Sequence, residues 1–168
     1  GSTGSIGTST LDIIRKDKKN FEIVFLSANN NYKKLVQQAK EFSVKNIFIK
    51  NKNFYEKTKR ILKNSKTKVY SGNTSINNII SQKLDYTMAA IVGVAGLQPT
   101  IDAIKISRTV ALANKESIIC GWEILSKLIK RYKTKILPVD SEHFSIMELT
   151  KDVRDDEVEE IIITASGG

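Results

Sequence analysis

The sequence predicts an α/β fold, with a mostly parallel sheet and helices on both of its faces. Three observations predict this class. Short apolar runs rich in β-branched residues recur along the 168-residue chain, as expected of strands. Amphipathic stretches separate these runs, and strand and helix alternating in this way form right-handed β-α-β units. A composition of 40% hydrophobic and 27% charged residues is sufficient to bury a core.

The predicted strands define the sheet. Seven apolar runs are predicted strands, at residues 23–26, 47–49, 68–70, 87–92, 109–112, 135–137 and 161–164. The acidic stretch 151–160 holds six acids against two bases. We expect it to be a solvated loop before the last strand.

Helices are predicted between the strands from apolar residues at helical spacing. A first helix from Thr8 to about Lys16 places Leu11 and Ile14 on one face. Two further helices show the same spacing, at Leu35, Val36, Ala39 and Phe42, and at Ile118, Trp122, Leu125 and Ile129. Pro99 suits the first turn of a helix. Cys120 and Trp122 are predicted core residues.

Charge and composition exclude some classes of protein. The formal net charge is +9, which favours anionic partners such as phosphates. The lysines are scattered and not interleaved with aromatic residues, so we expect no nucleic-acid partner. No apolar run approaches the length of a membrane span, so we expect no membrane partner. The single Cys120 cannot form an internal disulfide and fits a reducing compartment.

The opening residues 1–7 read GSTGSIG and match the glycine pattern of a dinucleotide-binding loop. Such a loop follows a strand and opens a helix, so that backbone N–H groups face a pyrophosphate. The helix and the next strand follow at the expected distance, but the first strand of a Rossmann-like fold is missing. The chain does not begin with Met and ends SGG, so we expect both ends to be cut. A flexible Gly-Ser linker is the alternative interpretation.

The turn after the next strand indicates which cofactor is preferred. NAD-binding sites place an acid there to hold the ribose 2′-hydroxyl. Residues 27–31 instead read SANNN, with Lys33 and Lys34 just beyond. Amides and cations can receive a 2′-phosphate, so the turn favours NADP. An ordinary Asn-rich turn is the alternative.

Five segments in order resemble the 1-deoxy-D-xylulose 5-phosphate reductoisomerase family. They are GSTGSIG at 1–7, MAAIVGVAGL at 88–97, ALANKES at 111–117, LPVDSEH at 137–143 and TASGG at 164–168. The resemblance spans the whole chain. It implies an NADPH-dependent oxidoreductase of isoprenoid biosynthesis that converts 1-deoxy-D-xylulose 5-phosphate to 2-C-methyl-D-erythritol 4-phosphate. It also implies an NADPH-binding Rossmann-like domain at 1–136, followed by the beginning of a catalytic domain at 137–168.

The resemblance assigns cofactor contacts residue by residue. The pyrophosphate would lie against the glycine loop, at Gly1, Thr3, Gly4, Ser5 and Ile6. The adenosine ribose and its phosphate would lie near Ala28, Asn29 and Asn30. Asn29 stands where the family commonly has a basic residue. Asn114 and Glu116 match further cofactor contacts.

The resemblance also assigns metal and substrate contacts. Asp140 and Glu142 match two ligands of a divalent metal, and two carboxylate oxygens suit Mg²⁺ or Mn²⁺. Lys115 matches a substrate contact beside the nicotinamide, where it can steady negative charge developing on oxygen. Glu142, Ser141 and Ser166 match further contacts to the sugar phosphate. We expect His143 to orient this site. Taken alone, Asp-x-Glu at a strand end is more often a helix N-cap with a first-turn acid.

Several expectations concern the whole protein. The third metal carboxylate and the mobile flap of the family lie outside this chain, so we expect it to be inactive alone. The resemblance implies a homodimer at full length, in the bacterial cytoplasm or in a plastid. Two alternatives are a different NADP-linked dehydrogenase, such as a semialdehyde or homoserine reductase, and a non-catalytic module that binds anionic ligands.

Overall fold

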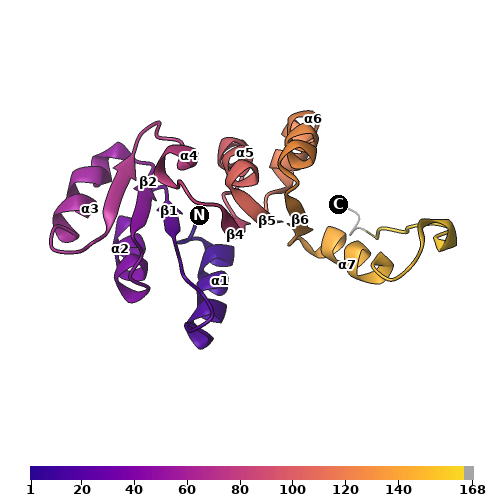
Figure 1. Ribbon diagram of the computed structural model, residues 1–168, viewed down its shortest axis with the longest axis horizontal. Coiled ribbons are helices and arrows are strands. Elements are labelled where there is room, and N and C mark those ends of the chain that lie inside the picture. The colour runs from indigo at the N-terminus through magenta and orange to yellow at the C-terminus, as the bar shows by residue number, and fades with distance from the viewer. Residues whose placement is uncertain (165–168) are drawn as a thin grey trace.

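The computed structural model describes residues 1–164, and their strands form two three-stranded sheets in which every pairing is parallel (Figure 1). The first sheet has the order β1-β2-β3, with bounds Phe25–Ala28, Asn46–Ile49 and Lys68–Ser71. The second has the order β4-β5-β6, with bounds Leu84–Ala89, Ser107–Leu112 and Lys135–Pro138. The predicted α/β class is confirmed, although the sheet is divided into two.

Helices connect the strands and flank both sheets (Figure 1). The α-helices are α1 (Ser5–Lys16), α2 (Tyr32–Glu41), α3 (Tyr55–Ile61), α4 (Ile76–Ile79), α5 (Leu97–Ile106), α6 (Lys115–Tyr132) and α7 (Ser141–Thr150). Short 3-10 turns are η1 (Lys52–Phe54), η2 (Val94–Gly96) and η3 (Asp155–Glu157). None of the helices in residues 1–164 is long and apolar enough to cross a membrane.

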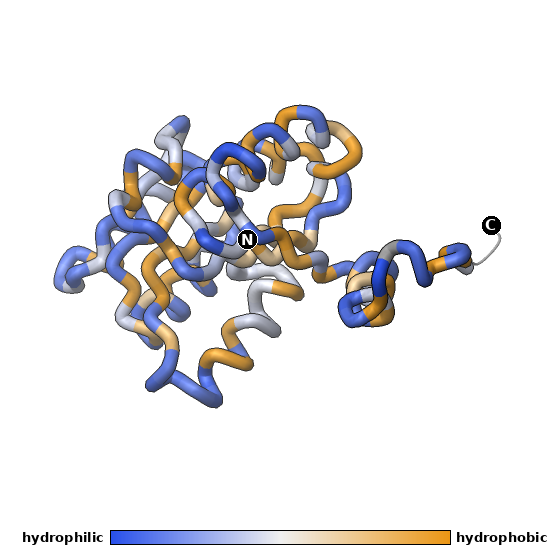
Figure 2. Tube along the Cα trace, turned by 45° about the vertical axis from the view of Figure 1, so that its right-hand side comes forward, coloured by the Kyte–Doolittle hydropathy of each residue, from blue (hydrophilic) through white to orange (hydrophobic). Residues whose placement is uncertain are grey.

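Each sheet has a hydrophobic core of its own. In the first, Leu35 and Ala39 of α2 pack on Ile47 and Ile49 of β2, and all four are fully buried. The core of the second sheet is formed by buried residues of α5, β5 and α6: Ala103, Ile104, Val110 and Leu125. Figure 2 shows hydrophobic residues along the strands and hydrophilic residues at the outer turns. The helical spacing therefore locates the α2 face correctly.

The first two residues connect the two sheets. The Ser2 backbone N–H donates to Ser27 O at 2.8 Å, beside the end of β1. Gly1 lies against the residue after β4, since a Cβ on Gly1 would come 2.6 Å from Ala90 O. The glycine loop thus begins between the carboxyl ends of β1 and β4 (Figure 1).

The strand predicted at 161–164 is absent from the described structure. These residues have no regular structure, and Ile161, Ile162 and Ile163 are 53%, 76% and 63% exposed. A strand is stable only when its backbone groups pair with a neighbour. Within residues 1–164 no strand lies beside this segment, so the prediction is wrong here. The acidic stretch before it is mostly exposed and irregular apart from η3, as expected.

The prediction that Cys120 and Trp122 are core residues is also wrong. Helix α6 buries Ser117, Gly121 and Leu125 instead. The small Gly121 lets α5 approach closely, because a Cβ there would lie 2.5 Å from Leu97 Cδ1. Cys120 is exposed and Trp122 is 57% exposed. The predicted stripe is therefore correct at Leu125, but one turn earlier the helix buries Gly121 and not Trp122.

Candidate dinucleotide and metal site

The polar segments selected from the sequence follow the carboxyl ends of the strands. Asn29 and Asn30 follow β1, the turn at 90–93 follows β4, Asn114 follows β5 and Asp140 follows β6. Parallel strands end at the same edge of a sheet, and open α/β sheets bind their ligands at that edge. The order of the elements therefore brings these segments to one side of each sheet.

The glycine loop leads directly into α1, one turn earlier than predicted. Helix α1 begins at Ser5 and its N-cap is Gly4, which contributes no side-chain cap. The first N–H groups of a helix have no partner within the helix. Gly4, Ser5 and Ile6 are exposed and Thr3 is partly exposed. This helix start can receive an anion.

Gly7 has a packing role in this loop. It is buried, and a Cβ added there would lie 2.6 Å from Ser2 Cα and 2.8 Å from Ser2 C. A Cβ on Gly4 would meet only Gly1 O, at 3.6 Å. The loop folds back on its own helix at Gly7, whereas Gly4 leaves room on the solvent side for a ligand.

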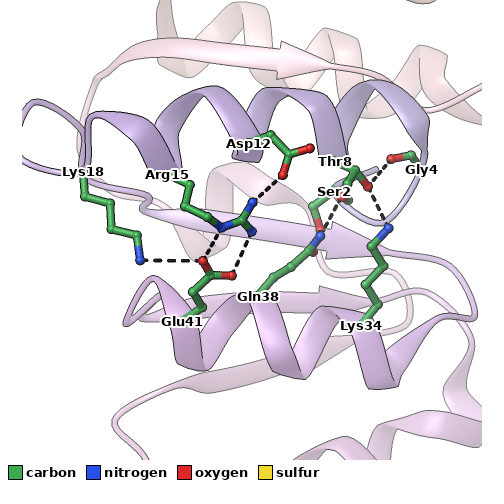
Figure 3. Close-up of polar contacts among 9 residues, drawn as sticks. All are labelled: Ser2, Gly4, Thr8, Asp12, Arg15, Lys18, Lys34, Gln38 and Glu41. Atoms are coloured by element: carbon green, nitrogen blue, oxygen red, sulfur yellow. Dashed lines mark hydrogen bonds and ion pairs between the residues drawn. The ribbon is translucent and has the colours of Figure 1, made fainter.

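Helix α2 holds the glycine loop through a buried amide (Figure 3). Gln38, 5% exposed, donates from Nε2 to Ser2 O at 3.0 Å. Ser2 Oγ donates to Gln38 Oε1 at 2.8 Å. Lys34 Nζ also reaches Thr8 Oγ1, at 2.8 Å, beside the first turn of α1. Gln38 is not among the site residues predicted from the sequence, although a polar residue within the apolar stripe of α2 is a usable signal.

The Asn-rich turn after β1 combines two roles. Asn31 is the N-cap of α2, since its Oδ1 accepts from Lys34 N at 3.1 Å. Ala28 is buried, while Asn29 and Asn30 are exposed. The alternative interpretation of an ordinary turn thus holds for Asn31, and two amides remain exposed for a ligand.

Asn114, a predicted cofactor contact, is buried and hydrogen-bonded to backbone groups. Its side chain is 1% exposed, donates to Ile91 O and to Gly93 O (2.9 Å), and accepts from Ser117 N (2.8 Å). Asn114 therefore caps α6 and fixes the turn at Gly93, which has a φ of 74°. Glu116 is partly exposed and Lys115 is exposed in the first turn of α6. Of these three consecutive residues, Lys115 and Glu116 reach the surface and Asn114 does not.

The predicted metal ligands lie at the start of α7. Asp140 is the N-cap: its Oδ1 accepts from His143 N at 3.0 Å and contacts His143 Nδ1 at 2.6 Å. Partial desolvation opposes ionisation, but the hydrogen bonds from His143 outweigh it and hold the pKa of Asp140 below its usual range. The carboxylate is thus ionised at neutral pH.

Glu142 is exposed, and one of its oxygens, Oε2, accepts from Ser141 Oγ at 3.0 Å. Within the described part of the chain, no three Asp, Glu, His or Cys side chains form a group that could hold a metal ion. Asp140 and Glu142 supply hard oxygen donors, which fit a divalent cation in type but form only part of a ligand set. Ser166, the other predicted substrate contact, lies outside the described residues.

A parallel α/β fold with a glycine loop at a helix start and polar groups along the strand ends defines a Rossmann-like dinucleotide-binding protein. Comparison with known families specifies the class further. The chain belongs to the 1-deoxy-D-xylulose 5-phosphate reductoisomerase family, whose model matches residues 1–121. The model of the family's C-terminal domain matches residues 136–168.

Individual relatives agree with this result. The 1-deoxy-D-xylulose 5-phosphate reductoisomerase of Pelagibacter ubique is 52% identical over the whole chain, and that of Wolbachia pipientis is 43% identical. The chain spans 44% and 43% of these proteins, less than half of their length.

Solved structures of the family resemble the fold. The Zymomonas mobilis enzyme in complex with NADPH superposes with a TM-score of 0.80 at 39% identity, over 85% of this chain and 38% of that one. A reductoisomerase in complex with NADPH, fosmidomycin and magnesium gives a TM-score of 0.79 at 35% identity, over 85% of this chain and 36% of that one.

Proposed function

We propose that this chain is the cofactor-binding part, and the beginning of the catalytic part, of an NADPH-dependent reductoisomerase. The reaction converts 1-deoxy-D-xylulose 5-phosphate to 2-C-methyl-D-erythritol 4-phosphate. The observation that supports it most is the glycine loop at the start of α1, held by Gln38 and followed by an acid-free turn after β1. Family membership favours this reaction over a semialdehyde or homoserine reductase and over a binding module.

In this proposal the loop from Gly1 to Ile6 binds the cofactor pyrophosphate through its backbone N–H groups. Ala28, Asn29 and Asn30 lie near the adenosine ribose and its phosphate. Asn114 is a proposed cofactor contact, and its amide also shapes the turn at Gly93 and the start of α6. Glu116 contacts the cofactor, and NADPH supplies the hydride when bound.

On the second sheet, Asp140 and Glu142 contribute two carboxylates for Mg²⁺ or Mn²⁺. The bound cation supplies charge neutralisation for the substrate oxygens. Lys115, exposed at the first turn of α6, is placed one residue from the proposed cofactor contacts and steadies negative charge on the substrate. Ser141 and Ser166 bind the sugar phosphate.

The proposal extends to the arrangement of the whole protein. It assigns residues 1–136 to the cofactor domain and 137–168 to the catalytic domain, and the boundary falls inside β6. The bacterial relatives support a cytoplasmic enzyme, and we include a homodimer in the proposal. Ultracentrifugation of the full-length polypeptide distinguishes a monomer from a dimer.

The test is turnover by a full-length polypeptide that contains this chain. We expect loss of NADPH absorbance when 1-deoxy-D-xylulose 5-phosphate and Mn²⁺ are both present, and formation of 2-C-methyl-D-erythritol 4-phosphate by mass spectrometry. The control omits the sugar phosphate. NADPH oxidation without this product would contradict the assignment.

A further inference from the structure

The loops after β1 and β2 are joined beyond the ends of the strands. Lys50 N donates to Ala28 O at 2.9 Å, and Asn51 N donates to Asn29 O at 3.1 Å. The two loops are therefore hydrogen-bonded to each other directly after β1 and β2 (Asn46–Ile49). This fixes the position of Asn51 beside the turn that carries Asn29 and Asn30.

The backbone N–H of Asn53 determines the orientation of the Asn51 side-chain amide. Asn53 N–H is a donor only, and it donates to Asn51 Oδ1 at 3.0 Å, where Asn51 is the N-cap of η1. The oxygen of Asn51 is thus directed to η1, which leaves its Nδ2 to donate to Asn30 Oδ1 at 2.8 Å.

The same reasoning applies to Asn30. Its oxygen accepts from Asn51, so its NH₂ group, which lies in the same plane on the other side of the Cβ–Cγ bond, points away from Asn51. Asn30 is exposed, and neither 27–34 nor 50–54 contains an acid, while Lys33, Lys34, Lys50 and Lys52 add positive charge. The amide therefore presents donors, in a positive environment, at the place where the proposed function puts the adenosine ribose.

We propose that Asn51 is a positioning residue that sets the cofactor preference by directing the Asn30 NH₂ group to the 2′-phosphate of NADPH. An ionised phosphate offers only acceptors, so a donor is needed opposite it. A ribose 2′-hydroxyl is instead held by an acceptor such as a carboxylate. This inference rests on the proposed function, because it assumes that Asn30 lies near the ribose.

The decisive variant is Asn51→Asp in the full-length polypeptide. The carboxylate still accepts from Asn53 N, so η1 keeps its cap, but it cannot donate to Asn30. The Asn30 amide then turns its NH₂ group towards the carboxylate and away from the cofactor. We expect the ratio of NADPH to NADH affinity, measured by calorimetry, to fall about tenfold or more.

Two further variants distinguish the effect of the Asn30 amide orientation on the affinity ratio from the effect of an added negative charge. Asn51→Ser keeps a cap acceptor and adds no charge, but frees the Asn30 amide to take either orientation, so the ratio should fall about twofold. Asn46→Asp adds the same charge at the first residue of β2, the opposite end of this strand. It should leave the ratio as in the wild type.

A double-mutant cycle with Asn30→Ala tests whether Asn51 affects the cofactor through Asn30. If Asn51 acts through Asn30, Asn51→Ser should have no further effect on the ratio once Asn30 has lost its amide. Asn51→Asp with a wild-type ratio and a wild-type melting temperature would overturn the inference. Wild-type protein that binds neither cofactor would instead overturn the proposed function, which the first titration reveals before any variant is made.

Discussion

Gln38 and Ser2 bind each other through two hydrogen bonds that run in opposite directions. The Gln38 amide donates to the Ser2 carbonyl at 3.0 Å, and the Ser2 hydroxyl donates to the Gln38 oxygen at 2.8 Å. Both residues are buried, so neither bond is readily replaced by water. A side chain on α2 thus adds two buried hydrogen bonds to those that hold the proposed phosphate loop (Figure 3).

Gln38→Glu is expected to weaken NADPH binding at neutral pH. A carboxylate can accept from Ser2 Oγ but cannot donate to Ser2 O, and leaving a buried acceptor unpaired costs about 1–3 kcal/mol. A protonated carboxyl can donate again, so affinity should recover as the pH falls. The exposed neighbour Gln37 provides the control, since Gln37→Glu should show no such recovery. Equal pH profiles would count against this role of Gln38.

Gly7→Ala is expected to destabilise the protein by about 1–3 kcal/mol, as overpacking does. The new Cβ would meet the Ser2 backbone at 2.6–2.8 Å, and backbone cannot move aside as a side chain can. Gly4→Ala is the matched change, because its Cβ would lie 3.6 Å from Gly1 O. Chemical denaturation of both variants measures the difference, and equal losses of stability would refute the packing argument.

Asp140→Asn is expected to remove most turnover in the full-length polypeptide while leaving NADPH affinity unchanged. The amide keeps an oxygen for His143 N, so the N-cap of α7 survives, but one anionic metal ligand is lost. Glu142→Gln should have the same effect. Both are assayed against Mg²⁺ or Mn²⁺ concentration. Ordinary activity of Asp140→Asn at low Mg²⁺ would show that the metal assignment is wrong.

The start of α7 is expected to loosen in acid. The pKa of Asp140 is lower in the folded protein than its ordinary value. Its contribution to stability is therefore fully present above the ordinary pKa and is lost as the pH falls through the lowered one. The amide proton shift of His143 in NMR spectra reports this step. Asp140→Asn should abolish it, and a transition that persists in this variant would have another origin.

The 168-residue chain alone is expected to show no turnover. Among the described residues, the proposed metal site has two candidate carboxylates, and Glu142 is open to water. Affinity for hard cations increases with the number of charged oxygen ligands. A side-by-side assay of this chain and of a full-length polypeptide under the same conditions measures the difference. Comparable rates would mean that the essential residues have been assigned to the wrong positions.

The sequence predicts most strands because their signal is local. Residues 46–49 and 68–71 are short apolar runs, and each forms a strand within a residue or so of the predicted bounds. The strand predicted at 87–92 lies at Leu84–Ala89, since the turn leading to Gly93 already begins after Ala89. The run at 161–164 is also apolar and β-branched, but it has no neighbouring strand in the described structure. A strand depends on its partner, which composition does not specify.

The sequence indicates which residue types form the candidate site, but not which side chains contact each other there. Motif order led to Asn114, yet its side chain bonds Gly93 O, 21 residues earlier in the chain. The contact between Gln38 and Ser2 spans 36 residues, and that between Asn51 and Asn30 spans 21. Such contacts depend on how the strands pair and where the helices pack, so they could not be predicted from the separate motifs.

The position of Gly1 and Ser2 between the ends of β1 and β4 has a mechanical consequence. Because this short segment touches both sheets, it transmits any restraint on the loop to both of them. A dinucleotide bound to the loop would reduce the motion of the first sheet relative to the second. Strand β5 is separated from the loop by β4 in the second sheet. Amide hydrogen exchange in β5 should nevertheless slow when the cofactor is added.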